Sequence, residues 1–413
     1  MGKKIVILGA GFGGLHTALT LGKKIGKENE IILIDKNPYH TYTPTLYEVA
    51  TTSKETASLI DLKSIVTIPI HKTVNGRNIN FINAEIKELD LLGGDVHLAD
   101  GQKIAWDYLV LALGAETNYF DIPGLKENSF DLKSFTEALQ IRDKILDLVL
   151  DGKVQIKIVI GGGGPTGVEL AGELEEWFGQ LKDDYGKCYA TITIVDSNPI
   201  ILNNLDKRVA ILAQKRLKKL GVEIINNEII TKVSNEEIVM KSGNKLAFDI
   251  LIWAGGVKAN SLVSNLPLKM EKRGRAEVMP QMYCLPQTPD LKLYGMIYAL
   301  GDVTCFYDKD GKPMPQVART AIEQGAVVAK NIIADLTNNK RTEYVPRAYP
   351  YIVPVGAKYA IAKLGPLVVS GFGGWLFKGL VEVNYLLSIM PFGRAIKTWL
   401  KGLSIFIQND RLG

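Results

Sequence analysis

Residues 3–15, which read KKIVILGAGFGGL, decide the fold of this chain. The apolar run at residues 5–8 is typical of a parallel strand that is buried on both faces. Gly9, Gly11 and Gly14 follow it with the G-x-G-x-x-G spacing. The first glycine allows a tight turn, the second lets the backbone approach a pyrophosphate, and the third lets the next helix pack closely on the strand. We interpret the stretch as the cradle of a dinucleotide.

Asp35 supports this interpretation. It ends a strand expected at residues 30–34 and follows the last glycine by about 20 residues, the distance at which an acidic side chain reaches a ribose hydroxyl. The alternative is a turn residue that only precedes Asn37 and Pro38. Because glycine-rich turns also occur where nothing binds, the motif needs further support.

The composition limits the classes of protein. With 413 residues, 46% of them hydrophobic, the chain can form two or three domains with a sizeable core. A net charge of +5 argues against nucleic acid as a partner, although it permits an acidic ligand or a lipid surface. The three cysteines lack the spacing of a disulfide framework, an iron–sulfur cluster or a zinc site, so no metal is expected. The early first strand leaves no room for a signal peptide, which favours the cytoplasmic side.

The first unit is repeated about 150 residues further along the chain. Each copy has a strand, a glycine-rich turn, a helix, a strand that ends in an aspartate, a short antiparallel meander and a closing strand. The closing segments, each a strand that ends in glycine, are expected at residues 107–114 and 249–256. In the second copy, the residues that correspond to the glycines and the aspartate of the first are Gly162, Gly164, Gly167 and Asp196. We therefore expect two dinucleotide-binding units.

Two such units need two dinucleotides. Hydride passes between a nicotinamide ring and a flavin ring, so we expect flavin adenine dinucleotide (FAD) in the first unit and a nicotinamide dinucleotide in the second. A 2′-phosphate about 4 Å from the carboxylate of Asp196 would be repelled by roughly 4 kcal/mol at an effective dielectric constant near 20. No arginine directly follows Asp196 to offset this repulsion. NADH is therefore favoured over NADPH.

A third motif is YALGD at residues 298–302, which precedes a helix expected at residues 316–336. Together with GAGFGG, DYLVLALGA, GGGGPTGVELAGEL and WAGGV, it resembles the two-dinucleotide-domain flavoprotein reductases. Within that group the chain is most similar to the type II NADH dehydrogenases, the NADH:quinone oxidoreductases that do not pump protons. The resemblance covers nearly the whole chain. It implies that electrons pass from NADH through FAD to a quinone.

The implied fold is α/β, with two Rossmann-like dinucleotide-binding domains in three layers, each a parallel sheet with an antiparallel meander. A C-terminal amphipathic region would associate with a membrane. We expect the FAD-binding domain at residues 1–120 and 285–345, interrupted by the NADH-binding domain at residues 121–284. The membrane-interface region would occupy residues 346–413.

The resemblance also implies roles for single residues. Asp302 would bind the ribityl chain of the flavin, and backbone N–H groups near Val317 and Ala318 would lie beside its pyrimidine edge. Glu169 matches the acidic residue near the nicotinamide and flavin rings and would be the catalytic side chain; the alternative is a first-turn glutamate that complements the helix dipole. The implied contacts are Gly9, Gly11, Gly14, Asp35, Ala112, Gly114, Asp302, Val317 and Ala318 for FAD, and Gly162, Gly164, Gly167, Asp196, Gly255 and Gly256 for NADH.

One departure from the family lies in the helix after Asp302. Quinone-reducing members carry glutamines there in an A-Q-x-A-x-Q pattern, whereas this chain has Arg319 and Glu323. At i and i+4 on one helix face, the two side chains either pair with each other or form a changed acceptor site. We expect a quinone as acceptor and leave its identity open.

The region from residue 365 onward combines apolar and aromatic residues with scattered charges. Its uncharged runs are too short for a membrane span of about 20 residues. The charged residues are Lys378, Arg394, Lys397, Lys401 and Arg411, against Glu382 and Asp410. Such a segment is typical of amphipathic helices in the bilayer interface, so we expect a peripheral protein on the cytoplasmic face of the membrane. The alternatives are a dimerisation face, which would make a homodimer, and a lid on the flavin domain.

In the resembling family, Lys378 would lie close to the quinone tunnel. Three other functions stay open. A soluble NADH-dependent reductase of a redox protein would need an exposed docking patch. A sulfide:quinone oxidoreductase would need cysteines beside the flavin, and Cys284 and Cys305 form no evident pair. A sensor that only binds the two nucleotides would carry a flavin that NADH does not reduce.

Overall fold

The computed structural model describes residues 2–409, which fall into two compact units. The chain alternates between them. Unit 1 comprises Met1–His40, Ile68–Thr117 and Val257–Arg347, and unit 2 comprises Thr41–Thr67, Asn118–Gly256 and Ala348–Gly413.

The first unit is built on the parallel sheet that the sequence predicts. The strands have the order β20-β9-β1-β2-β5, and every neighbouring pair is parallel. Their bounds are β1 Lys4–Leu8, β2 Glu30–Asp35, β5 Asn80–Asn83, β9 Tyr108–Leu111 and β20 Met296–Ala299. Ile5 to Leu8 are fully buried because both faces of the sheet are covered.

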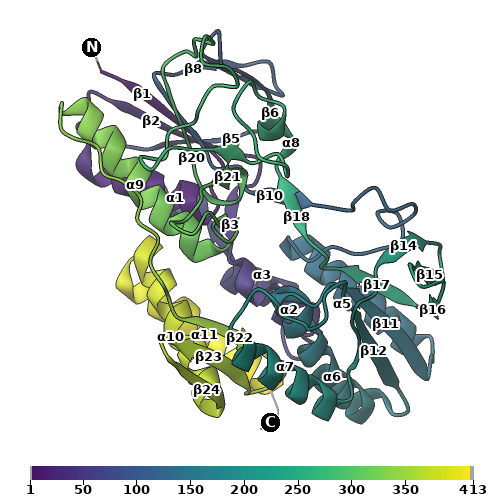
Figure 1. Cartoon of the computed structure of the whole chain (residues 1–413). Helices are drawn as coiled ribbons and strands as arrows, with labels where there is room; N and C mark the ends of the chain where they lie inside the picture. Colours follow the sequence, from purple (N-terminus) through teal and green to yellow (C-terminus); the bar gives the residue numbers. More distant parts are fainter. Residues whose placement is uncertain (1, 410–413) are drawn as a thin grey trace. The chain divides into compact units, whose positions relative to one another are not determined.

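Two layers cover this sheet. Val6 and Leu8 pack in a core cluster with residues of an antiparallel meander, β6 (Ile86–Asp90), β7 (Asp95–Leu98) and β8 (Lys103–Ala105). Successive side chains of a strand point to opposite faces, so Ile5 and Ile7 point to the other layer. Helices α1 (Phe12–Lys24) and α9 (Ala318–Leu336) lie side by side there (Figure 1).

The two helices approach closely at Gly13 and Gly325. A Cβ added at Gly325 would lie 2.8 Å from the carbonyl oxygen of Gly13. The Thr17 hydroxyl lies 2.8 Å from that oxygen and 3.2 Å from the carbonyl oxygen of Gly325. This contact fixes the first turn of α1 against the middle of α9.

The second unit repeats the arrangement with a parallel sheet in the order β13-β12-β11-β17. A second meander follows, as the sequence predicts. Helix α6 begins at Pro165 and runs to Tyr185. The other bounds are β11 Gln155–Gly161, β12 Tyr189–Val195, β13 Glu223–Ile225, β14 Ile230–Val233, β15 Glu237–Met240, β16 Lys245–Ala247, β17 Ile250–Trp253, α5 Phe135–Leu150 and α7 Lys207–Leu220.

The unit boundaries differ from the expected domains in two internal segments. Residues 41–67 group with unit 2, because α2 (Leu46–Ala50) and α3 (Leu59–Val66) pack into its hydrophobic core. Residues 257–284 group with unit 1, because β18 (Val257–Ala259) pairs with β10 (Ala115–Thr117). Neither segment belongs to the repeated motif, so the repeat could not place them.

The last segment forms part of unit 2 and begins with three antiparallel strands, β22 (Tyr351–Pro354), β23 (Ala360–Leu364) and β24 (Leu367–Gly371). Helices α10 (Phe372–Ile389) and α11 (Phe392–Asn409) follow and pack on each other, and α11 also packs on α3 (Figure 1). Within residues 2–409, none of the helices has the length and apolar character that crossing a membrane requires. Asp410 and Arg411 lie outside the described residues.

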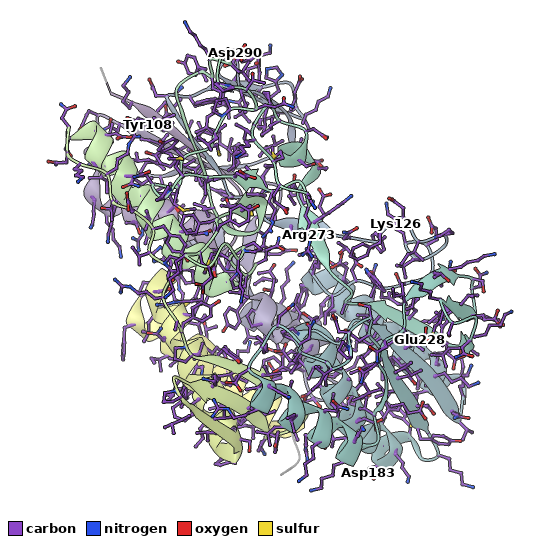
Figure 2. The ribbon with its side chains drawn as sticks, in the orientation of Figure 1. Tyr108, Lys126, Asp183, Glu228, Arg273 and Asp290 are labelled. Atoms are coloured by element: carbon purple, nitrogen blue, oxygen red, sulfur yellow. The ribbon has the colours of Figure 1, made fainter. Side chains whose placement is uncertain are left out.

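Charged side chains such as Lys126 and Asp183 project at the surface (Figure 2). Several short elements complete the chain. The short elements are β3 Tyr39–Thr41, η1 Thr43–Thr45, β4 Thr67–Pro69, α4 Ile70–Val74, α8 Ser261–Ser264, β19 Ala276–Glu277, η2 Gly301–Val303 and β21 Thr304–Cys305.

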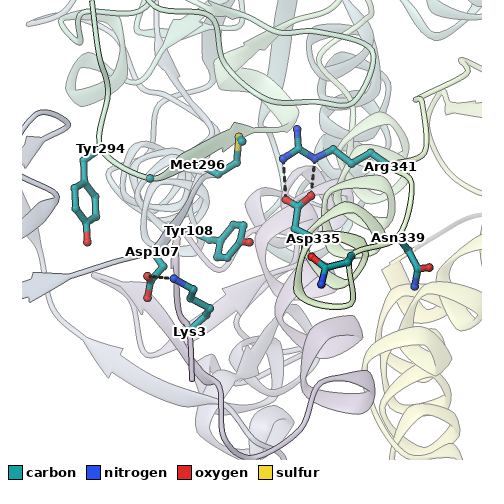
Figure 3. A pocket seen from close by; sticks show the side chains of 10 residues that line it. Lys3, Asp107, Tyr108, Tyr294, Met296, Asp335, Asn339 and Arg341 are labelled. Atoms are coloured by element: carbon teal, nitrogen blue, oxygen red, sulfur yellow. Dashed lines mark hydrogen bonds and ion pairs between the residues drawn. The ribbon is translucent and has the colours of Figure 1, made fainter. Parts of the chain in front are cut away.

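A groove of about 670 Å³ lies in unit 1 at the amino ends of β1, β9 and β20. Its charged side chains are paired within the groove: Lys3 Nζ lies 2.9 Å from Asp107 Oδ1, and Arg341 Nε lies 2.6 Å from Asp335 Oδ1 (Figure 3). Ligands of open α/β sheets bind at the carboxyl ends of the strands. The functional site is therefore expected at the other end of the sheet, where the glycine turn lies.

Candidate functional site

The glycine turn of unit 1 combines two closed positions with one open position. Gly9 has a φ of +98°, and a Cβ there would lie 2.4 Å from the carbonyl oxygen of Ala112. A Cβ at Gly14 would lie 2.0 Å from the carbonyl oxygen of Gly9. At Gly11, by contrast, a Cβ would meet nothing within 4 Å. The fold itself therefore requires Gly9 and Gly14, whereas Gly11 borders open space.

The glycine turn of unit 2 has the same construction. Gly162 has a φ of +115°, and a Cβ there would lie 2.5 Å from the carbonyl oxygen of Ala254. A Cβ at Gly167 would lie 2.0 Å from the carbonyl oxygen of Gly162, and a Cβ at Gly164 would meet nothing within 4 Å. Both turns thus leave room for a phosphate group at the middle glycine, beside the N-terminal N–H groups of a helix.

The two predicted ribose-binding aspartates bind the turns themselves. The carboxylate of Asp35 accepts hydrogen bonds from the N–H groups of Ala10 at 2.7 Å and Asn37 at 2.8 Å. The carboxylate of Asp196 likewise accepts a hydrogen bond from Gly163 N–H at 2.5 Å. Burial raises the pKa of Asp35 above its ordinary value, and the hydrogen bonds from these backbone donors oppose part of that shift. A carboxylate has further lone pairs, so ribose binding stays a prediction for both residues.

The positions predicted at the flavin lie at the carboxyl end of the first sheet. The N–H group of Ala112 donates a 2.9 Å hydrogen bond to the carbonyl oxygen of Leu8. Gly114 directly precedes β10 and has a φ of +72°. Asp302 lies in the short helix η2, where its carbonyl oxygen accepts a 2.9 Å hydrogen bond from Gln316. Val317 precedes α9 as its N-cap residue.

The start of α9 offers a cluster of backbone donors. The side chain of Val317 makes no capping hydrogen bond, so the first N–H groups, beginning at Ala318, have no partner within the helix. Gln324, the seventh residue of α9, is buried and accepts a 2.7 Å hydrogen bond from Gly301 N–H. It fixes the loop that carries Asp302, and the sequence analysis missed it because its role depends on a tertiary contact.

Arg319 and Glu323 form an ion pair with 2.8 Å between Nε and Oε1. The side chain of Arg319 is 55% exposed and that of Glu323 only 18%. Of the two alternatives that the spacing allowed, pairing on one helix face is therefore present. Whether the pair changes the acceptor stays a prediction.

Gly255 and Gly256 border aromatic rings in unit 2. A Cβ at Gly255 would lie 2.3 Å from the Trp253 ring, and a Cβ at Gly256 would lie 3.4 Å from the Phe120 ring. The Trp253 indole donates a hydrogen bond to the carbonyl oxygen of Asn118 at 2.8 Å. The tryptophan is thus fixed, and a side chain at Gly255 has no room.

A cluster of ionisable side chains lies in unit 2. Lys378, on α10, forms an ion pair with Glu48, on α2, and its ammonium group lies 5.4 Å from the centroid of the Tyr47 ring. Glu382, one turn further along α10, and Glu169, on α6, interact electrostatically with Lys378. The structure thereby brings together Glu169 and Lys378, two residues that the sequence analysis assigned to different ligands.

Burial controls the protonation of this acidic cluster. It raises the pKa of Glu169 to about 8, with the attraction of Lys378 opposing the shift and the repulsion of Glu48 adding to it. Burial also raises the pKa of Glu382, and Lys378 again opposes the shift. Glu169 is the fifth residue of α6, and no acidic residue lies in the first turn. The alternative of a first-turn glutamate is therefore wrong.

Two tyrosines pack beside the acidic cluster. The rings of Tyr42 and Tyr385 stack with 5.2 Å between centroids and 23° between planes. Burial raises the pKa of both phenols, and the carboxylates of Glu382, Glu48 and Glu169 raise that of Tyr42 further. Both tyrosines therefore stay neutral.

Glu48 and Tyr42 were not among the predicted site residues, although residues 39–50, which contain both, form a polar and aromatic stretch after Pro38. The sequence analysis named Glu382 only as a charge of the C-terminal region. One signal was available: Lys378 and Glu382 are spaced i and i+4 in an otherwise apolar helix, which indicates a buried polar face.

Two Rossmann-like units with matching glycine turns define a dinucleotide-dependent oxidoreductase. The family model for pyridine nucleotide-disulphide oxidoreductases matches residues 3–325. The chain belongs to that family.

Similar proteins have more specific names. A type II NADH:quinone oxidoreductase from Haemophilus influenzae is 29% identical over 379 residues, covering 81% of this chain and 81% of the relative. One from Mycobacterium tuberculosis is 28% identical over 436 residues, covering 99% of this chain and 89% of the relative. The structure of NDH2 from Plasmodium falciparum in complex with NADH has the same fold, with a TM-score of 0.84, 18% identity and full coverage of both chains.

The open middle glycines allow binding to be separated from folding. Gly164→Ala places its methyl group in free space, so we expect the free energy of unfolding to change by less than about 1 kcal/mol. The same methyl group would block the approach of a pyrophosphate, and the Kd for a reduced pyridine nucleotide should rise at least about tenfold. Gly167→Ala is the matched variant that should destabilise the fold. If Gly164→Ala bound the nucleotide as tightly as the wild type does in a titration, the assignment of Gly164 to the pyrophosphate site would be contradicted.

Proposed function

We propose that this protein is an NADH:quinone oxidoreductase that takes hydride from NADH into FAD and passes two electrons to a membrane quinone without pumping protons. The observation that carries the proposal is the pair of matching glycine turns, since one chain with two dinucleotide cradles suits hydride transfer between two dinucleotides. Membership of the family and the names of the relatives support the same reaction.

The residues of unit 1 suit FAD. The open space beside Gly11 and the N–H groups at the start of α1 would accept its pyrophosphate, and the N–H groups from Ala318 onward would stabilise negative charge on the ring. Bound FAD would supply a two-electron carrier between a hydride donor and a quinone. Unit 2 would bind NADH at Gly164, with the Asp196 carboxylate disfavouring a 2′-phosphate.

Glu169 would hold a proton for the reduction of the acceptor. A quinone takes up two protons with two electrons, and a carboxyl group with a pKa of about 8 keeps its proton at neutral pH. The ion pair between Glu48 and Lys378 fixes a charged partner near Glu169, which tunes the pKa. No covalent nucleophile is needed for this chemistry.

The amphipathic character of α10 supports a location at a lipid surface. Its exposed stripe is apolar, with Phe372, Leu376 at 50% exposed and Leu380 at 59% exposed. Its covered side carries Lys378 and Glu382. A helix that faces water normally has the opposite arrangement.

Helix α11 also exposes apolar side chains. Phe392 is 72% exposed and Leu400 is also exposed, while Arg394 and Lys397 lie exposed among them and would contact anionic headgroups. We place the protein peripherally on the cytoplasmic face of the membrane, bound through α10 and α11.

An anaerobic two-step reaction tests the function. NADH should bleach the visible absorbance of the bound flavin, and a short-chain quinone added afterwards should restore it. NADPH should bleach it at least about tenfold less effectively at equal concentration, because of the charge of Asp196. Bleaching by NADH without recovery by quinone would indicate another acceptor, such as a redox protein. The ion pair of Arg319 and Glu323 would then be the feature expected to change the acceptor. No bleaching would contradict the proposal and would favour a nucleotide sensor.

The role of Glu169 predicts a pH dependence. Because its pKa is raised to about 8, Glu169 keeps its proton below that pH and loses it above, so flavin reoxidation by quinone should slow as the pH rises past about 8. Glu169→Gln should lower that rate by roughly 100-fold and abolish this pH dependence. Glu175→Gln, on the same helix, is the matched control, because burial raises the pKa of Glu175 to about 7 outside the acidic cluster. A wild-type pH profile for Glu169→Gln, measured by stopped flow, would refute the role.

The membrane proposal predicts the effect of charge on α10. The double variant Leu376→Glu and Leu380→Glu should lower partitioning into anionic phospholipid vesicles about tenfold or more, since it places two charges in the apolar stripe. Leu150→Glu, at a leucine that is 64% exposed on α5, should partition as the wild type does. A double variant that keeps its partitioning but changes from dimer to monomer would show that the stripe is a dimerisation face.

A further inference from the structure

Ala10, between Gly9 and Gly11, is held on both of its peptide groups. Its N–H group donates to Asp35 Oδ2 at 2.7 Å, and its carbonyl oxygen lies 3.0 Å from Nδ1 of His40. A carbonyl oxygen only accepts hydrogen bonds, so Nδ1 carries the hydrogen and donates it. His40 lies in the polar and aromatic segment after Pro38, where the sequence alone fits a structural loop residue and a neighbour of the flavin equally well.

The surroundings of His40 keep its ring in place. The side chain is 2% exposed, and its ring meets the ring of Phe12 edge-on, with 4.9 Å between centroids and 90° between planes. Burial lowers the pKa of His40 to about 4, although the hydrogen bond to Ala10 opposes the shift. The imidazole is therefore neutral at physiological pH, in the tautomer that donates from Nδ1.

This hydrogen bond orients the group that faces the open space of the cradle. The carbonyl of Ala10 and the N–H of Gly11 belong to one planar peptide group. When His40 fixes the carbonyl, it also fixes the N–H at the N-cap position of α1, where no protein atom would meet a Cβ. Asp35 fixes the preceding peptide group in the same way.

The glycine turn of unit 2 is held by hydrogen bonds at the same two positions. There Gly163 occupies the position of Ala10, and its N–H donates to the Asp196 carboxylate at 2.5 Å. Its carbonyl oxygen accepts from the backbone N–H of Leu202 at 2.8 Å. Both turns thus hold the two successive peptide groups of the corresponding residue, the first through a carboxylate and the second through an N–H donor. In unit 1 the donor is a side chain, whereas in unit 2 it is main chain.

We propose that His40 is a positioning residue for the dinucleotide cradle of unit 1, where its Nδ1–H sets the orientation of the Ala10–Gly11 peptide group that binds the FAD pyrophosphate. The inference rests on the proposed function, because it takes FAD as the ligand of unit 1. The two cradles differ in this donor: a single side-chain substitution can remove it from the first, whereas in the second the donor is the backbone N–H of Leu202.

Two variants separate the donor from the bulk of the ring. His40→Phe keeps a ring against Phe12 but removes the donor. His40→Asn loses the ring but places an amide N–H at the position of Nδ1. We expect the Kd for FAD, measured on the full chain by fluorescence of released flavin, to rise at least about tenfold in His40→Phe and to stay within about threefold of wild type in His40→Asn.

NADH binding is the internal control, since the backbone of Leu202 clamps the turn of unit 2; its Kd should be unchanged in both variants. The proposal would be overturned if His40→Phe bound FAD as tightly as the wild type does. It would also be overturned if both variants lost FAD affinity equally, because the effect would then come from packing of the ring. Wild-type protein that binds FAD and is reduced by NADH keeps the proposed function whatever the variants do. Wild-type protein that binds no flavin would instead refute the function itself.

Discussion

The rest of the structure depends on two places where backbone touches backbone with no side chain between. The carbonyl oxygens of Gly9 and Gly162 each leave 2.0 Å for a Cβ at Gly14 and Gly167, far less than any side chain needs. A larger residue would move the helix away from its strand, and with it the N–H groups at the helix start. The layered packing of each unit and the position of its binding site are therefore one constraint, met twice in one chain.

How much of this the sequence predicts depends on whether a feature is local. The glycine turns, the aspartates that follow them and the two meanders are encoded within short stretches, and the structure has all of them. The acidic cluster is not local, because Glu48, Glu169 and Lys378 come from three distant segments that only the fold brings together. The grouping of residues 41–67 with unit 2 is nonlocal in the same way, because α2 and α3 carry no repeat signal.

The same acidic cluster is costly for stability. One lysine can balance one carboxylate, and Lys378 is committed to Glu48, so ionisation of Glu169 or Glu382 would leave an uncompensated charge in a poorly hydrated place. The raised pKa values of these two glutamates are the response, since a neutral carboxyl group is cheaper to bury. Apolar residues would serve a purely structural core better. The cluster suits chemistry that uses protons, as the proposed role of Glu169 in the reduction of a quinone does.

Helix α10 joins this chemistry to the surroundings of the protein. Its covered side supplies Lys378 and Glu382 to the cluster, and its exposed stripe of Phe372, Leu376 and Leu380 disfavours water. In water both arrangements would be unfavourable, because the helix buries its charges and exposes its apolar side chains. Against a lipid surface the exposed stripe becomes favourable and offsets part of the cost of the buried charges. An apolar acceptor dissolved in that surface would then meet the helix that carries Lys378, so the proposed membrane binding and the charged partner of Glu169 would both depend on α10.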